Sequence, residues 1–530
     1  MPHSLFRTKS PRQFLGETQP GAGPALRRTF TPFRLIILGV GCIVGAGLFS
    51  ITGPIAAYNT GPAITFSFIL AAIICSLTGL CYAELASRLP VSGSAYAYAY
   101  TTIGELPAWL VGWSLVVEYV LGAALVCTSW SQYFVVLLRD AGITLPDLLT
   151  STPAEGGIID LPAMFIAGVM AVFVVRGAQT SAMANNILVA LKLGIIFLFV
   201  VLGWRYVKSE NLTPYLPANT GEFGSFGVSG VLRGASVAFV AFLGFDSVSA
   251  MAQETKNPAR SMPIGILGSL VVVAVVYVLF GYVLTGVANY HEFQGADSIA
   301  PVSVAIAHLP WPWLNRLIVL AILMGYSSVV LVLMMAQSRI FMSMSRDGVL
   351  PKVFGRIHPA WRTPWLGSII LALVIALFSG LMPGEAAGEL CSIGTLFAFT
   401  IVCYIVIVLH RRDRKAAALK AQAGAALPAA APSPIEEGKL PYTAEKTVGG
   451  LGETVGGQGE SAQPEATFRT PWVPFIPLLS IAISLVFMFA MPLSAWISLG
   501  LWLLAGAAIY FGYGYRHSTL NSKAPSQDEK

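Results

Sequence analysis

Residues 39–53 read GVGCIVGAGLFSITG, and they place Gly39, Gly41, Gly45 and Gly47 inside a long apolar segment. Glycine weakens a helix interior by about 1 kcal/mol relative to alanine, so a helix built only to cross lipid would hold other residues there. Small residues also let two helices approach closely, and this structural explanation holds for any single glycine pair. What the segment does therefore depends on whether the helix is closely packed or interrupted.

The composition surrounding this segment is that of a polytopic membrane protein. The 530-residue chain is 55% hydrophobic and 11% charged, with a mean hydropathy of +0.71, whereas soluble proteins carry about 25% charged residues. A spanning helix needs about 20 mainly apolar residues. Twelve segments are candidates: 34–57, 61–86, 106–138, 160–178, 182–204, 231–254, 262–288, 313–343, 365–382, 388–410, 472–491 and 494–514. We therefore expect an all-α integral membrane protein with twelve transmembrane helices.

The distribution of positive charge predicts the orientation. With the N-terminus inside, 26 of the 32 Lys and Arg residues fall on the cytoplasmic side and five on the outer side, and Lys192 lies within a span. This is the bias of the positive-inside rule. We expect a multi-pass protein of the plasma (inner) membrane with both termini cytoplasmic. The net charge of +6 then reflects topology, so lipid is an expected partner and nucleic acid is not.

The spans and the polar segments between them divide the chain into six parts. They are a cytoplasmic tail (1–33), a first transmembrane repeat (34–204), a second (231–410), a flexible cytoplasmic linker (411–470), two final helices (471–515) and a cytoplasmic tail (516–530). No apolar signal segment precedes the first span. The linker is rich in Ala, Gly, Glu and Pro, a composition that buries too little apolar surface to fold alone. A plain spacer is the simpler interpretation, and a regulatory segment is the alternative.

Cysteine and histidine, the residue types that most often hold metals, are scattered along the chain. All six cysteines fall within spans without a C-x-x-C pair, and the six histidines lie in tails, loops or span ends. We expect no metal, no cofactor and no histidine proton relay. The spans also hold no nucleophile–base set, which disfavours an enzyme.

The glycines of the first span have a counterpart in the sixth, where FVAFLGFDS carries Gly244 and Asp246 at a similar depth. Two interrupted helices at corresponding places in two five-helix halves indicate an inverted-repeat transporter with a midplane site. A break exposes backbone groups that must line a cavity or meet a ligand. Helix N-termini attract a carboxylate and orphan carbonyls accept from an ammonium, so we expect a zwitterionic substrate. Asp246 either caps the second half-helix or contacts that substrate.

Three segments carry a family resemblance. CYAELASRLPVSGSAYAYAYTTIGELPAWLVGWSLVVEY (81–119), GFDSVSAMAQETKNPARSMPIGI (244–266) and AQSRIFMSMSRDGVLP (336–351) resemble the cationic amino acid transporter family of the amino acid–polyamine–organocation (APC) superfamily. The resemblance covers roughly residues 5–410. It implies a LeuT-like (APC) fold of two inverted five-helix repeats with broken helices 1 and 6, followed by two further helices. Bacterial members of this family include carriers of neutral amino acids.

The resemblance also implies a substrate site at the two breaks. The backbone N–H groups of the first-span motif would hold the substrate carboxylate, and this motif falls on Ile43, Gly45, Ala46 and Gly47. Carbonyls from both breaks would hold the α-amino group, and these belong to Ile43, Val240, Ala241 and Leu243.

Three pocket positions differ from the family pattern. Relatives often carry Ser or Thr where this chain has Ala46, and Phe where it has Val240. The aromatic lid over the substrate would then fall to Phe239 or Phe242. Tyr326 takes a pocket place where relatives often have Met or a smaller residue. It mildly favours a small or polar neutral substrate over a cationic one, and no acidic residue stands out in the pocket.

Lys192 lies midway along its span, too far from either end to reach an interface. It is either satisfied by carbonyls in the bundle or a proton-coupling amine, because burial favours the neutral form and lets the proton come and go. The resemblance implies the second role, with Lys192 bracing span 1 against span 8 and Ser327 and Ser328 as polar neighbours. Glu118 is either a coupling or substrate-pathway residue or a structural partner.

These observations predict a secondary active amino acid transporter that imports a neutral amino acid with a proton by alternating access. An exchanger and an amine or polyamine carrier are the alternatives within transport. A transporter-like amino acid receptor is less favoured, because the linker carries no recognisable output module. The partners expected are the amino acid and lipid, with a small single-span subunit or none.

Overall fold

The computed structural model describes residues 5–10, 26, 28–294, 301–382, 384–426 and 468–522. These residues form helices and loops, with no β-strand among them apart from two isolated bridges. Eight helices in the described part are long and apolar enough to cross a membrane, and four further apolar helices are shorter, at 10–17 residues. The chain is therefore a multi-pass membrane protein.

The first half of the chain runs from α2 to α9. Its helices are α2 (Pro32–Ile43), α3 (Ala46–Ile55), α4 (Ile64–Arg88), α5 (Ser94–Thr102), α6 (Glu105–Val116), α7 (Gly122–Asp140), α8 (Leu161–Arg176) and α9 (Ala178–Trp204). A π-helical turn, η3 (Val117–Leu121), joins α6 to α7 without a break. Such turns rotate the side chains that follow and recur at functional sites.

The second half begins at α10 (Gly227–Val240), which is followed by the 3₁₀ helix η7 (Phe245–Glu254). The remaining longer helices are α11 (Pro258–Val287), α13 (Trp313–Arg346), α14 (Trp365–Leu381), α15 (Gly384–Ala426), α16 (Phe475–Phe489) and α17 (Leu493–Ile509). The short helices α12 (Pro301–Ala307), α18 (Tyr515–His517) and α19 (Thr519–Ser522) complete the set. The predicted linker, 411–470, begins within α15, and its residues 427–467 lie outside the described part.

Both predicted interruptions are present. Helix α2 ends at Ile43 and α3 begins at Ala46, so the first span breaks at Val44 and Gly45. Helix α10 ends at Val240, and Gly244 then takes the left-handed conformation at φ 101°, which glycine adopts at no steric cost. Each break interrupts the regular hydrogen bonding of its helix.

The glycines of the opening segment also serve close packing. A Cβ on Gly41 would lie 2.4 Å from the Asn185 side chain, and one on Gly47 would lie 2.4 Å from the Cβ of Ala241. Gly45 occupies the interruption itself, and a Cβ on it would also lie 2.9 Å from the Val329 side chain. The two explanations for the glycine-rich segment therefore both hold.

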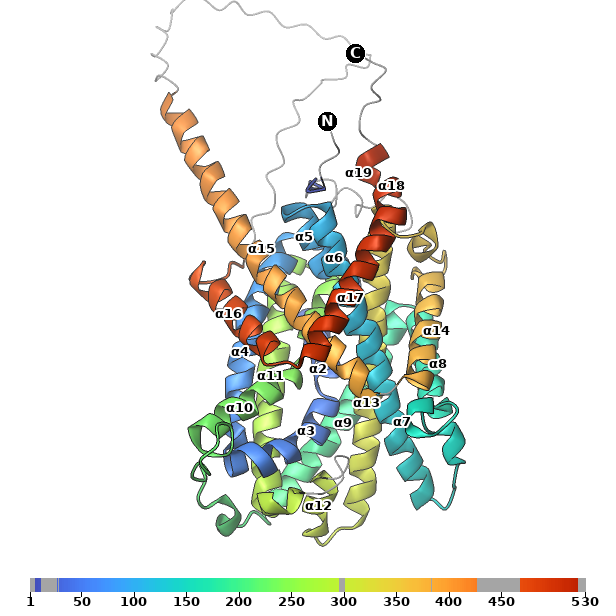
Figure 1. The fold of residues 1–530 in the computed structure, drawn as a ribbon, viewed down its shortest axis with the longest axis vertical. Helices are drawn as coiled ribbons and strands as arrows, with labels where there is room; N and C mark the ends of the chain where they lie inside the picture. The colour runs from blue at the N-terminus through green and yellow to red at the C-terminus, as the bar shows by residue number, and fades with distance from the viewer. Residues whose placement is uncertain are drawn as a thin grey trace, which may run out of the picture. The chain divides into compact units, whose positions relative to one another are not determined.

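Helix α11 packs along α4 and α2, while α13 packs against α9 and α7 (Figure 1). Thr31 begins α2, where its hydroxyl accepts from the Arg34 N–H at 3.4 Å and Pro32 follows as the first helical residue. This is a favourable start for a helix, since proline there needs no donor. Packing of this kind brings the two interrupted helices together against α13.

Candidate substrate site

A cavity of about 280 Å³ lies where the two interrupted helices meet. The interrupted helices contribute Cys42, Ile43, Gly45, Gly47, Ile51, Val240, Ala241, Leu243 and Gly244 to its lining. Neighbouring helices contribute Glu118, Gly122, Leu125, Val126, Val329, Leu333, Gly388, Cys391, Ser392 and Thr395. Most of these groups are apolar, with a few polar ones, which is the usual make-up of a small-molecule site.

Glu118 is an acidic residue in the lining of this cavity. It lies on the π-helical turn η3, is only 4% exposed, and neighbours Asp246 and Thr395. Both of its carboxylate oxygens are buried, and neither has a hydrogen-bond partner among the described residues. The expectation that no acid stands out in the pocket is therefore wrong. The sequence left open whether Glu118 is a coupling or substrate-pathway residue or a structural partner, because the π-helical turn sets the direction of the side chain and no pattern in the residues reveals that turn.

The residue after Glu118 reaches the second interruption. The Tyr119 hydroxyl donates to Oδ2 of Asp246, which is fully buried in the first turn of η7. The other oxygen, Oδ1, is buried without a partner among the described residues. Asp246 does not cap η7, because Gly244 is the cap residue and the N–H of Ser247 donates to the Gly244 carbonyl at 3.2 Å.

Two of the carbonyls assigned to the substrate ammonium already have a neighbour. The Tyr277 hydroxyl on α11 lies 3.0 Å from the carbonyl oxygen of Ile43 and 2.9 Å from that of Ala241. A hydroxyl carries one proton, so it donates to one of these carbonyls at a time. Each carbonyl has a second lone pair, so both keep acceptor capacity toward the cavity.

Lys192 is fully buried beside the first interruption. Its ammonium nitrogen Nζ donates to the carbonyl of Val44 at 2.6 Å, to that of Gly41 at 3.0 Å and to the Ser328 hydroxyl at 2.7 Å. The Ser328 hydroxyl also lies 2.8 Å from the Gly41 carbonyl. Lys192 thus connects α9, α2 and α13 as expected, whereas Ser327 bonds the carbonyl of Leu323 on its own helix.

Three predicted pocket residues do not line the cavity. The Tyr326 ring packs edge-to-face against Tyr133, with ring centroids 5.8 Å apart. The Phe242 ring packs on Tyr277 at 5.0 Å, and the Phe239 ring lies 5.1 Å from Phe487. None of the three is in the lining, so neither phenylalanine is placed as a lid. The contacts with Tyr277 and Phe487 hold these two rings within the bundle. Ala46, the first residue of α3, is also absent from the lining.

Glu84, near the end of α4, forms an ion pair with the residue four positions along its helix. Its Oε1 accepts from Arg88 at 3.0 Å, and its Oε2 accepts from the backbone N–H of Thr470 at 2.9 Å. The segment that leads into α16 is therefore held against the end of α4. This second contact joins residues far apart in the chain, and so only the folded structure reveals it.

Two interrupted apolar helices that meet at a cavity lined by apolar residues are consistent with a membrane permease. The chain belongs to the amino acid permease family, whose model matches residues 30–495. It is 36% identical to the methylthioribose transporter of Bacillus subtilis (strain 168), over 98% of this chain and 99% of that one. It is 34% identical to the branched-chain amino acid permease BcaP of the same organism, over 98% and 100% of the two chains.

A more distant relative is the human cationic amino acid transporter 4, at 29% identity over 94% of this chain and 89% of that one. The expected membership of the APC superfamily is confirmed, and so is the expectation of a transport protein rather than an enzyme. Amino acid transport in a membrane follows from the family.

Proposed function

We propose that the protein imports a neutral amino acid together with a proton, by alternating access across the plasma (inner) membrane. In this proposal twelve helices span the membrane as two inverted five-helix repeats, 34–204 and 231–410, followed by two further helices. The interruptions at α2–α3 and α10–η7 support it, because each falls in the first span of its half. The bias of Lys and Arg supports cytoplasmic termini.

The observation that carries the site is the cavity between the two breaks. The N–H groups from Gly45 to Gly47 begin α3, where a helix N-terminus favours a carboxylate. Ile43, Val240, Ala241 and Leu243 line the same cavity, and in this proposal their carbonyls accept from the α-amino group. One small site therefore offers complementary groups to both ends of an amino acid.

A neutral substrate is favoured by the rest of the lining. Ile51, Leu125, Val126, Val329 and Leu333 present apolar surface to the position of the substrate side chain. The relatives named branched-chain amino acid permeases support the same class. We therefore propose an apolar side chain, in place of the small or polar one that Tyr326 favoured.

A cationic amino acid is the second candidate, and Glu118 is the observation that favours it. Its carboxylate lies in the lining and has no hydrogen-bond partner among the described residues. It would therefore pair with the side-chain ammonium or guanidinium of a cationic substrate. The relatives named cationic amino acid transporters point the same way. Substrate competition separates the two candidates directly.

Lys192 is the proposed proton-coupling residue. Its amine holds the broken end of α2 against Ser328 on α13, so loss of its proton would weaken the contact between these helices. A proton gradient would then act on the same interface that opens the cavity. No metal or organic cofactor enters this proposal, and the coupling ion is H⁺.

The test is uptake into proteoliposomes with an imposed pH gradient and no sodium, screened across the twenty amino acids. Concentrative uptake of leucine, isoleucine or valine that a protonophore abolishes supports the proposal. Uptake of arginine or lysine supports the second candidate. Uptake only into vesicles preloaded with amino acid would indicate an exchanger, and binding without flux would indicate a receptor.

A further inference from the structure

A basic segment, residues 411–415, follows the membrane-crossing part of α15. The residues from Leu390 to Leu409 include no charged side chain. At a rise of 1.5 Å per residue they extend about 30 Å, which is the thickness of the hydrocarbon core of a bilayer. The basic segment holds four cations and one acid, and so has a formal charge of +3. These charges therefore begin at the depth of the lipid headgroups.

The four cations of the basic segment lie on one side of the helix. Helix α15 continues without interruption to Ala426, and residues three and four positions apart on a helix are neighbours. Arg411 is such a neighbour of Arg414 and Lys415, and Arg412 is a neighbour of Lys415. All four side chains are exposed, and together with Val408 they line one hollow of the surface. One small area thus concentrates the positive charge.

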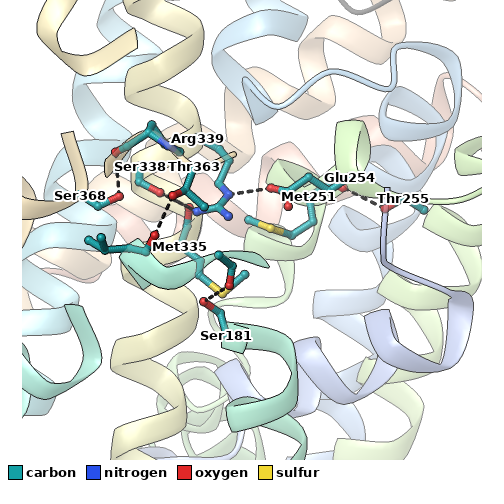
Figure 2. A network of polar contacts seen from close by, with 12 residues as sticks. Ser181, Met251, Glu254, Thr255, Met335, Ser338, Arg339, Thr363 and Ser368 are labelled. Carbon is teal, nitrogen blue, oxygen red and sulfur yellow. Dashed lines mark hydrogen bonds and ion pairs between the residues drawn. The ribbon is translucent and has the colours of Figure 1, made fainter. Parts of the chain in front are cut away.

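Basic residues elsewhere in the described part have carboxylates of the protein as partners. Nε of Arg339 donates to Oε1 of Glu254 at 2.8 Å where η7 ends against α13 (Figure 2). Helix α4 has a single basic residue in its last turn, Arg88, and that residue pairs with Glu84. The basic segment contains one carboxylate for four cations. Most of its charge is therefore not balanced within the segment, and it exceeds what α4 carries at its end.

We propose that the basic segment binds the headgroups of anionic phospholipids. Clusters of Lys and Arg next to a spanning helix attract anionic lipid, and each basic residue near the surface strengthens the attraction about fivefold. A guanidinium presents two parallel N–H groups to a phosphate. Val408, one turn nearer the hydrocarbon, offers apolar surface to the acyl chain. The proposed topology puts this leaflet on the cytoplasmic side, and the binding itself does not depend on that direction.

The chain holds a second source of negative charge. Residues 427–467 include six glutamates and two lysines, so this part of the linker is also complementary to the basic segment. Its glutamates are spread along the sequence, and only Glu436 and Glu437 are adjacent. A phospholipid instead carries its phosphate at the depth where the apolar part of α15 ends. Lipid is therefore the favoured occupant, and the linker is the alternative that the experiment must separate from it.

Binding at this segment bears on the carrier because α15 also contributes to the substrate cavity. Gly388, Cys391, Ser392 and Thr395 of this helix are in the cavity lining. Charged residues held at the interface help to set the tilt of a spanning helix. We therefore expect anionic lipid to change the rate of transport in addition to binding.

The test is a lipid titration of the full-length protein in a neutral detergent, in which native mass spectrometry counts the bound lipids. Phosphatidylglycerol is the probe and zwitterionic phosphatidylcholine is the reference. The test variant combines Arg411→Gln, Arg412→Gln, Arg414→Gln and Lys415→Gln, and each change is also made alone. A charge-preserving variant changes the three arginines of the segment to lysine. The matched control removes the same number of exposed cations elsewhere, at Arg139, Arg205, Lys208 and Arg233.

Each single change to glutamine should weaken phosphatidylglycerol binding about fivefold. The combined variant should bind it no better than phosphatidylcholine, whereas the control and the lysine variant should bind it nearly as the parent does. Equal affinity in the parent and the combined variant, or an equal loss in the control, would overturn the proposal. So would binding that appears only after the six linker glutamates are replaced by glutamine, since the linker would then occupy the segment. Lipid binding is measured without transport, so its outcome is independent of the proposed function.

Discussion

Replacing Lys192 by methionine tests the coupling proposal most directly. Methionine keeps an unbranched side chain of similar length but removes the amine, and with it the contacts to Gly41, Val44 and Ser328. The Gly41 carbonyl keeps its bond from Ser328, which leaves the Val44 carbonyl as the acceptor that loses its partner in this cluster. One unsatisfied buried acceptor costs about 1–3 kcal/mol, so we expect a folded protein with moderately lowered thermal stability.

The expected effect on transport is larger than the effect on stability. For one proton per substrate, a gradient of one pH unit stores about 1.4 kcal/mol and supports an accumulation ratio of about tenfold. Lys192→Met should reduce this ratio to one, while exchange of labelled for unlabelled substrate continues. The assay is radiolabel uptake into proteoliposomes, with and without the gradient.

The two adjacent serines of α13 provide a matched control. Ser328 bonds Lys192, whereas Ser327 bonds the Leu323 carbonyl of its own helix. Ser328→Ala should impair gradient-driven accumulation and Ser327→Ala should not. Undiminished accumulation in Lys192→Met would refute the reasoning and leave the lysine as a structural brace between α9, α2 and α13.

Three further changes have separate expected outcomes. Gly47→Leu should lower thermal stability by about 1–3 kcal/mol or more through overpacking, because its Cβ would lie 2.4 Å from that of Ala241; normal stability and normal substrate affinity together would contradict this placement. Glu118→Gln should remove any inhibition of leucine uptake by arginine or lysine while leucine binding persists, and unchanged competition would exclude Glu118 from side-chain selection. Glu84→Ala should destabilise the protein by about 1–3 kcal/mol, since it leaves the buried N–H of Thr470 without its acceptor; an unchanged melting temperature would argue against that anchor.

The residues alone predicted much of the fold. Apolar length and charge bias predicted the helical membrane class, and each predicted span overlaps a helix of the structure. Glycines near Gly45 and Gly244 predicted both interruptions, because glycine is a local property that alters backbone geometry without help from other segments. The Glu84–Arg88 pair was predictable for the same reason, since residues four apart on a helix are neighbours.

The side-chain environment of the cavity was less accessible to sequence reasoning. Tyr326 and Phe242 were expected in the pocket, but their rings pack on Tyr133 and Tyr277 instead. The sequence left Glu118 as either a coupling or substrate-pathway residue or a structural partner. The structure puts it in the lining of the cavity. A rotation of a helix by a fraction of a turn decides such cases, and that rotation depends on how several helices pack together.

The sequence by itself therefore determined the membrane class, the approximate helix boundaries, the two breaks and the position of Lys192 in the middle of its helix. These follow from hydrophobicity and backbone preference, which act over a few neighbouring residues. Only the tertiary structure decided what Lys192 bonds, which side chains face the cavity, and that Arg339 meets Glu254. Those contacts join residues 85 to 151 positions apart, and they exist only once packing has brought distant helices together.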